Sequence, residues 1–141
     1  MSKTVIIKIP GVERVIDANF NRAKEGLRVC EDTARFIIDD KSLSAGYKSV
    51  RHQLTAVIDS LLLKKMILAR NIVGDVGRST TFSESKRVNV EDVFNANTQR
   101  VKESLRVLEE FVKLMDGSSA EKFKRLRYKV YELEKRAFAA R

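Results

Sequence analysis

Mostly hydrophobic residues recur at spacings of three and four along two long stretches of the chain. The first series consists of Ile16, Phe20, Ala23, Leu27, Cys30, Ala34 and Ile37. The second consists of Phe94, Thr98, Val101, Leu105, Leu108, Val112 and Met115. Because an α-helix completes a turn in about 3.6 residues, each series lies on one face of a helix. The pattern predicts helices over residues 12–39 and 90–115.

Each predicted long helix is followed by a second amphipathic stretch, and the start signals agree with this division. Asn89 can cap the helix over 90–115, with Asp92 three residues later. Ser42 can cap a helix with one further apolar stripe, and Ser118 forms a capping box with Glu121 before another. The chain therefore predicts two helical hairpins.

The two halves also repeat one another in sequence. Residues 15–31 read VIDANFNRAKEGLRVCE, and residues 93–109 read VFNANTQRVKESLRVLE. Ten of these 17 paired positions are identical, where average composition gives about one chance match. We therefore expect a single all-α domain, a four-helix bundle built from a duplicated helical hairpin with pseudo-twofold symmetry. Its parts are a hairpin repeat over 12–70, a Gly-containing central loop over 71–88 and a hairpin repeat over 89–140.

Composition limits where the protein works and what it can bind. The 141 residues include 28 Lys and Arg against 19 Asp and Glu, a net charge of +9 that favours anionic partners. The lone Cys30 cannot form an internal disulfide, and His52 has no cluster of metal ligands around it, so we expect a cytoplasmic protein. The apolar run over 61–68 is too short for a membrane span. Val5–Ile9 is expected to form an extended arm.

One edge of the predicted apolar face carries polar side chains that both copies retain. They are Asn19 and Arg22 in the first copy and Asn97 and Arg100 in the second, each set followed by a small residue, Gly26 or Ser104. An arginine fork suits a phosphate or carboxylate, and the small residue leaves room for a close approach. The opposing interpretation is an exposed ladder of weak ion pairs.

The second helices extend this candidate site. Arg51 and Arg127 lie at matching positions in the two hairpins, so we expect them to join Arg22 and Arg100 around a shared cleft. Such a cleft would attract polyanions.

The central connection reads NIVGDVGRSTT over residues 71–81. Its glycines can turn backbone N–H groups toward an anion, its hydroxyls add donors, and its lone carboxylate can hold Mg²⁺ or orient an attacking group. The candidate phosphate-binding residues are Gly74, Gly77, Ser79 and Thr80, with Asp75 as the candidate metal ligand. An ordinary connecting loop explains the same composition equally well.

The duplicated DANFNRAKEGLRVCED and NANTQRVKESLRVLEE, the RNIVGDVG loop and the late LRYKVYELEK resemble one known family. It is the monofunctional hydroxymethylpyrimidine phosphate kinase family, a helical domain often fused ahead of thiamine phosphate synthase. The resemblance covers residues 12–136. It implies transfer of the γ-phosphoryl group of ATP, with Mg²⁺, to 4-amino-5-hydroxymethyl-2-methylpyrimidine phosphate in thiamine biosynthesis.

On this interpretation the phosphoryl-transfer chemistry falls to Arg22, Arg100 and Asp75, and substrate binding to Asn19, Arg51, Asn97 and Arg127. Acidic residues of the two long helices could instead orient the arginines or coordinate Mg²⁺ through water; these are Glu25, Glu31, Glu103 and Glu109.

Two other functions remain open. One is a noncatalytic helical partner domain of thiamine phosphate synthase. The other is a basic bundle that binds nucleic acid, which the interleaved acidic residues and the absence of a stacking-aromatic motif make the weaker alternative. Long amphipathic helices also leave surface for a homodimer.

Overall fold

The computed structural model describes residues 11–61, 63–79 and 86–140. Every element assigned in that part of the chain is helical, which confirms the all-α class. In order they are α1 (Val12–Asp32), its continuation as the π-helix η1 (Thr33–Ile38), α2 (Lys41–Asp59), α3 (Leu63–Leu68), α5 (Val90–Val112) and α6 (Gly117–Ala139). The predicted arm at Val5–Ile9 lies outside the described residues.

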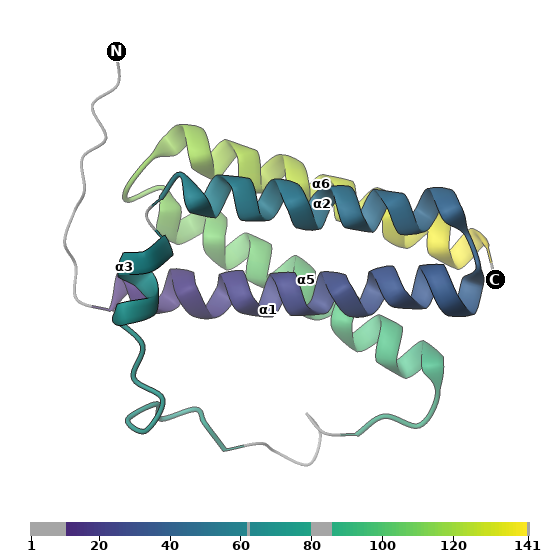
Figure 1. Cartoon of the computed structure of the whole chain (residues 1–141), viewed down its shortest axis with the longest axis horizontal. Helices are drawn as coiled ribbons and strands as arrows, with labels where there is room; N and C mark the ends of the chain where they lie inside the picture. Colours follow the sequence, from purple (N-terminus) through teal and green to yellow (C-terminus); the bar gives the residue numbers. More distant parts are fainter. Residues whose placement is uncertain (1–10, 62, 80–85, 141) are drawn as a thin grey trace.

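The four long helices pack side by side (Figure 1). α1 contacts both α2 and α5, and α6 contacts the same two helices. The most extensive of these interfaces joins α1 to α5, which cross at an angle in Figure 1. The short helix α3 packs against α1, and the chain that leaves α3 runs along the α1 side of the molecule. This arrangement places residues 77–79 of the connection beside the interface between α1 and α5.

The predicted apolar faces meet in one core. Leu27 on α1 and Leu105 on α5 occupy matching positions in the repeated sequence, and both are fully buried. Tyr47 on α2 meets Phe94 on α5 edge to face, with ring centroids 6.3 Å apart. Full burial of an aliphatic or aromatic side chain of this size contributes about 1.5–3 kcal/mol. The helical periodicity therefore identifies the residues that hold the fold together.

One of the three predicted N-terminal helix caps is confirmed, and two are wrong. Asn89 caps α5, because its Oδ1 accepts from the Asp92 N–H at 2.8 Å. The predicted caps at Ser42 and Ser118 are wrong. Asp40 caps α2 by accepting from the Leu43 N–H, and Asp116 caps α6 by accepting from the Ser118 N–H. In each case an aspartate two residues earlier has extended backbone angles and reaches the free N–H groups first.

The end of the first long helix has a wider turn than the sequence predicts. Residues 33–38 are π-helical, and Asp39 follows in the left-handed region with φ 58°. The Asp40 N–H donates to Ala34 O at 3.0 Å, which closes this end of the helix. Phe36 and Ile37 remain 65% and 63% exposed, so the predicted apolar face does not continue into the core here.

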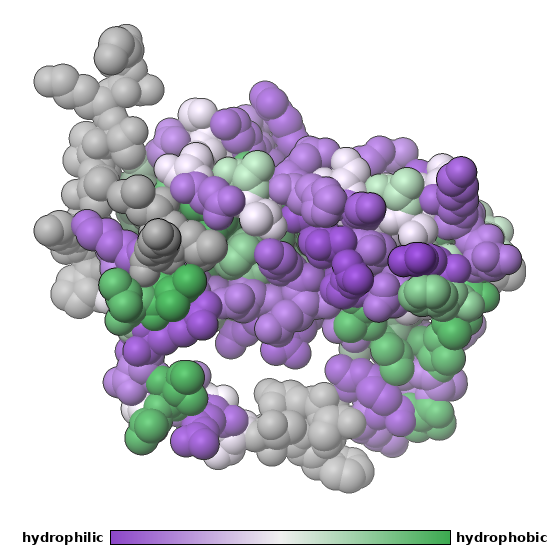
Figure 2. All heavy atoms as spheres, in the orientation of Figure 1, coloured by the Kyte–Doolittle hydropathy of each residue, from purple (hydrophilic) through white to green (hydrophobic). Residues whose placement is uncertain are grey.

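Apolar side chains gather on the surface in Figure 2, and two of these surfaces lie on helices. One lies at the end of the bundle where η1 meets the start of α5, and includes Phe36, Ile37 and Val90. The other lies at the end of α3, where Leu68 is 86% exposed. Within the described chain, none of the helices has the length and apolar character that a bilayer crossing requires.

Candidate functional site

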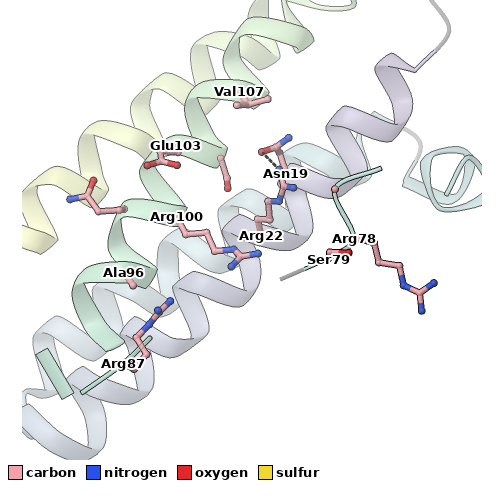
Figure 3. A pocket seen from close by; sticks show the side chains of 12 residues that line it. Asn19, Arg22, Arg78, Ser79, Arg87, Ala96, Arg100, Glu103 and Val107 are labelled. Carbon is pink, nitrogen blue, oxygen red and sulfur yellow. Dashed lines mark hydrogen bonds between the residues drawn. The ribbon is translucent and has the colours of Figure 1, made fainter. Parts of the chain in front are cut away.

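A cleft of about 570 Å³ opens between α1, α5 and the segment that follows α3 (Figure 3). Four of its lining residues are arginines and one is a glutamate, so its walls carry net positive charge. We call it the arginine cleft. Its lining consists of Asn19, Arg22, Gly77, Arg78, Ser79, Arg87, Ala96, Gln99, Arg100, Glu103, Ser104 and Val107.

The cleft brings together the two arginines that the repeat predicts, one from each half of the chain. Arg22 projects from α1 and Arg100 from α5, and both reach toward the space between the helices in Figure 3. Within the described residues neither has an ion-pair partner, and Arg22 Nη1 lies 3.5 Å from the amide oxygen Oδ1 of Asn19. Two unpaired guanidinium groups facing one space can bind a phosphate or carboxylate bidentately.

Of the two predicted asparagines, one lines the arginine cleft and the other does not. Each donates from Nδ2 to a carbonyl one turn earlier in its own helix, Asn19 to Val15 O and Asn97 to Val93 O, both at 2.8 Å. Asn19 lines the arginine cleft, whereas Asn97 is not among the lining residues. The amide nitrogens are thus used within the helices, and Asn19 alone of the pair presents its side chain to the cleft.

Gly26 allows α1 and α5 to approach each other closely. A Cβ atom added to Gly26 would lie 2.7 Å from Val101 Cγ2 and 3.1 Å from Asn97 O. The room that the sequence suggested for a ligand beside Gly26 is therefore filled by α5. Its counterpart Ser104 does line the cleft.

Arg51 and Arg127 do not reach the arginine cleft. Arg51 donates to both carboxylate oxygens of Glu31, with Nε 3.0 Å from Oε1. Arg127 donates in the same way to Glu109, and these hydrogen bonds raise the pKa of the Arg127 guanidinium. The side chains are 14% and 5% exposed in the first pair and 11% and 3% in the second. The two pairs tie α2 to α1 and α6 to α5, so the four predicted arginines do not share one cleft.

The segment after α3 contains two turns, each stabilised by a hydrogen bond from a backbone N–H to a side chain of the same segment. Asn71 Oδ1 accepts from the Gly74 N–H at 2.8 Å, and Asp75 Oδ1 accepts from the Gly77 N–H at 3.0 Å. Gly77 and Ser79 line the cleft, whereas Gly74 and Asp75 do not. Thr80, the last predicted residue of the phosphate-binding loop, lies outside the described residues.

Asp75, the predicted Mg²⁺ ligand, lies in the connecting segment and does not line the arginine cleft. Its Oδ1 already accepts from the backbone. In the part of the chain that the structure describes, no three His, Cys, Asp or Glu side chains gather where they could hold a metal ion.

Three polar cleft residues, Arg78, Arg87 and Gln99, are not among those that the sequence predicts. Arg78 and Arg87 lie in the connection between hairpins, where no periodicity indicates which way a side chain points. In Figure 3, Arg78 extends away from Arg22 and Arg100. Gln99 could have been found, because it precedes Arg100 on α5 and matches Asn21 in the first copy.

The fold and the cleft define a small all-helical protein with a cationic site between its two repeated helices. Residues 14–136 match the model of the ThiD2 family, and the chain belongs to that family. It is 40% identical over 121 residues to thiamine-phosphate synthase of Rhodopirellula baltica, covering 85% of this chain and 32% of that protein. It is also 40% identical over 124 residues to thiamine-phosphate synthase of Synechocystis sp., covering 87% of this chain and 35% of that protein. No solved structure matches the chain.

These relatives correct the function predicted from the resemblance. They carry the name thiamine-phosphate synthase and not that of a kinase, and the matching family is a small helical one. The predicted ATP-dependent phosphotransferase is therefore wrong on this comparison, while the connection to thiamine biosynthesis is confirmed. The chain spans about a third of the length of the curated relatives it matches.

Proposed function

We propose that the chain is a noncatalytic helical domain that binds a phosphorylated reactant or product of thiamine-phosphate synthesis and works together with thiamine-phosphate synthase. The observation that carries this proposal is the meeting of Arg22 and Arg100 in one cleft. They come from matching positions of the repeated sequence and have no ion-pair partner within the described residues. The family match and the name of the relatives supply the pathway.

The composition of the cleft favours a particular kind of ligand. Charge-assisted hydrogen bonds from guanidinium groups to a phosphate contribute about 1.5–3 kcal/mol each. Ser79 adds a hydroxyl donor, and Glu103 provides one acidic acceptor among the arginines. The ligand that suits this set has a phosphate at one end and a hydrogen-bond donor or a positive charge at the other.

We further propose that the fold is a four-helix bundle produced by duplication of one hairpin. The paired ion bridges support this proposal, because Glu31 with Arg51 and Glu109 with Arg127 join the helices of each hairpin in the same way. The amide bonds of Asn19 and Asn97 repeat as well. On this proposal the arginine cleft lies where the two copies of one helix face each other.

An exposed apolar surface at the end of the bundle supports the proposal that the chain works with thiamine-phosphate synthase. Phe36, Ile37 and Val90, at 65%, 63% and 47% exposure, border grooves of about 350 and 400 Å³ at the end of the bundle. Ala140, which follows α6, lines one of these grooves. Because this chain spans about a third of its relatives, they contain further chain that this surface can contact. We assign the surface to the synthase portion of such a protein.

Isothermal titration calorimetry with thiamine phosphate tests the binding proposal. Arg22→Ala and Arg100→Ala should each weaken binding by about tenfold or more, as expected from the loss of one charge-assisted contact. Arg125→Ala is the matched control, since Arg125 is exposed on α6 and outside the cleft. Absence of binding by the unaltered protein would overturn the ligand proposal. Turnover of ATP would overturn the noncatalytic one.

Co-elution with purified thiamine-phosphate synthase on a sizing column tests the partner. Ile37→Glu should abolish co-elution, whereas Leu68→Glu, which adds the same charge at the other apolar surface, should leave it intact. Loss of self-association with Ile37→Glu, without any complex with the synthase, would instead assign this surface to a second copy of the chain.

A further inference from the structure

An ion pair between a buried carboxylate and an exposed arginine joins α1 to the start of the segment that lines the arginine cleft. Arg70 follows α3, and its Nε and Nη2 donate to the two carboxylate oxygens of Asp17 at 2.6 and 2.9 Å. The Asp17 side chain is 5% exposed and that of Arg70 is 40% exposed. These hydrogen bonds raise the pKa of the Arg70 guanidinium. Asn21 Nδ2 also donates to Asp17 Oδ1, at 3.2 Å, so the carboxylate is held from two sides.

The segment beyond Arg70 is otherwise weakly attached. Residues 71–79 are all exposed. Among the described residues, the hydrogen bonds of this stretch stay within it, as in the turns at Gly74 and Gly77. Asp17 lies less than two helical turns before Asn19 and Arg22, which the end of the segment faces across the cleft. The ion pair thus fixes the start of a segment whose other end, residues 77–79, lines the cleft.

The second half of the chain lacks this ion pair. Asn95 occupies the position that matches Asp17, and its Oδ1 is buried without a hydrogen-bond partner among the described residues. The second copy thus keeps the arginine of position 22, as Arg100, but not the aspartate of position 17. The carboxylate is present only in the half that the central segment contacts.

We infer that the ion pair between Asp17 and Arg70 positions the 71–79 segment over the arginine cleft, so that both residues control anion binding without touching the ligand. This inference rests on the proposed function for its ligand, but its structural part stands on the ion pair alone. Asp17 and Arg70 are positioning residues, and their effect passes through the Ser79 hydroxyl and through the charge of Arg78, which lines the cleft without pointing at Arg22 and Arg100.

A nitroxide label on Val76→Cys tests the structural part without a ligand, because Val76 is fully exposed and does not line the cleft. The native Cys30 is buried and does not compete for the label. Asp17→Asn, which introduces the residue found at the matching position 95, should make the label distinctly more mobile. Asp32→Asn is the control, since it removes the same charge from a pair with Arg28 elsewhere on α1 and should leave the label unchanged. Arg70→Gln provides a second route to the same loss.

Binding of inorganic pyrophosphate then tests the functional part. Asp17→Asn should weaken binding by about tenfold, equivalent to about 1.4 kcal/mol, despite the more positive net charge. In a chain that already carries Arg78→Ala and Ser79→Ala, Asp17→Asn should cause no further loss, because the effect passes through those residues. A further loss of affinity when Asp17→Asn is added to that chain would overturn the positioning role. So would an Asp17→Asn variant that binds pyrophosphate as tightly as the unaltered protein while Arg22→Ala binds it more weakly. If the unaltered protein does not bind pyrophosphate, the proposed function fails. An unchanged label in Asp17→Asn would refute the inference independently.

Discussion

The first half of the molecule, α1 with α2, and the second half, α5 with α6, share some contacts and differ in others. Each half has a buried glutamate bound to an arginine of the following helix, Glu31 with Arg51 and Glu109 with Arg127. They differ where Asp17 matches Asn95 and where Gly26 matches Ser104. The shared pairs hold the helices of each hairpin together. The differing residues anchor the central segment, set the helix crossing or line the cleft.

Breaking the ion pairs that the two halves share should have the largest effect on stability. Glu31→Gln and Glu109→Gln each leave a largely buried guanidinium without its counter-charge, and we expect each to lower the free energy of unfolding by about 3–5 kcal/mol. Urea denaturation followed by circular dichroism measures this. Similar losses in the two halves would support equivalent roles; a loss below about 1 kcal/mol in one half would show that the pairs are not equivalent.

The glycine that differs between the halves should have the next largest effect. Gly26→Ala introduces a Cβ atom 2.7 Å from Val101 Cγ2 and 3.1 Å from Asn97 O, so α1 and α5 must separate. We expect a loss of about 1–3 kcal/mol in the free energy of unfolding. Ser104→Ala, at the matching position, should cost less than about 1 kcal/mol. Equal effects at the two positions would contradict the close packing of α5 against Gly26.

Cys30, which matches Leu108 in the second half, provides a chemical test of burial. Desolvation raises the pKa of its thiol to about 11, although a hydrogen bond with Thr98 acts in the opposite direction. The folded protein should therefore react very slowly with iodoacetamide at pH 8, and unfolding should restore ordinary reactivity. Because the pKa of the thiol is higher in the native state than in the unfolded state, the native state binds this proton more tightly. The free energy of unfolding should therefore fall as the pH rises from about 9 to about 11. Rapid labelling of the native protein would contradict the buried position.

The exposed arginines that pair with glutamates on the surfaces of α1 and α5 should have the smallest effect. Arg28 lies 3.5 Å from Glu31, Arg106 lies 3.7 Å from Glu109, and the arginine side chains are 53% and 56% exposed. Arg28→Ala and Arg106→Ala should each change the free energy of unfolding by less than about 1 kcal/mol, because water screens such pairs. A thermal melt of each variant measures the change, and a larger loss would mean that these residues support the buried pairs.

Much of the fold could be predicted from periodicity, because a core helix must place its apolar residues on one face. The stripe from Ile16 to Leu27 and its counterpart on α5 are buried as predicted. The caps of α2 and α6 could not be chosen correctly, since Asp40 and Ser42 are both good caps and the choice depends on how the chain enters the helix. The π-helical turn over 33–38 has no sequence signal of this kind.

The candidate site could be predicted only where the repeat constrains it. Arg22 and Arg100 meet in the cleft because their registers match on α1 and α5. Arg51 and Arg127 share a register too, but periodicity does not reveal that Glu31 and Glu109 lie opposite them and bind them. Asp17 belongs to the repeated stretch, yet its partner Arg70 is 53 residues away, beyond the reach of any local pattern.

The most direct test of the central claim is a titration of the isotope-labelled protein with thiamine phosphate, followed by amide chemical shifts. The account predicts saturable shifts grouped at Arg22, Ser79 and Arg100, with the amides around Arg51 and Arg127 unchanged. Shifts confined to the groove that Arg28, Lys48 and Arg51 line would contradict the account. So would the absence of any saturable shift.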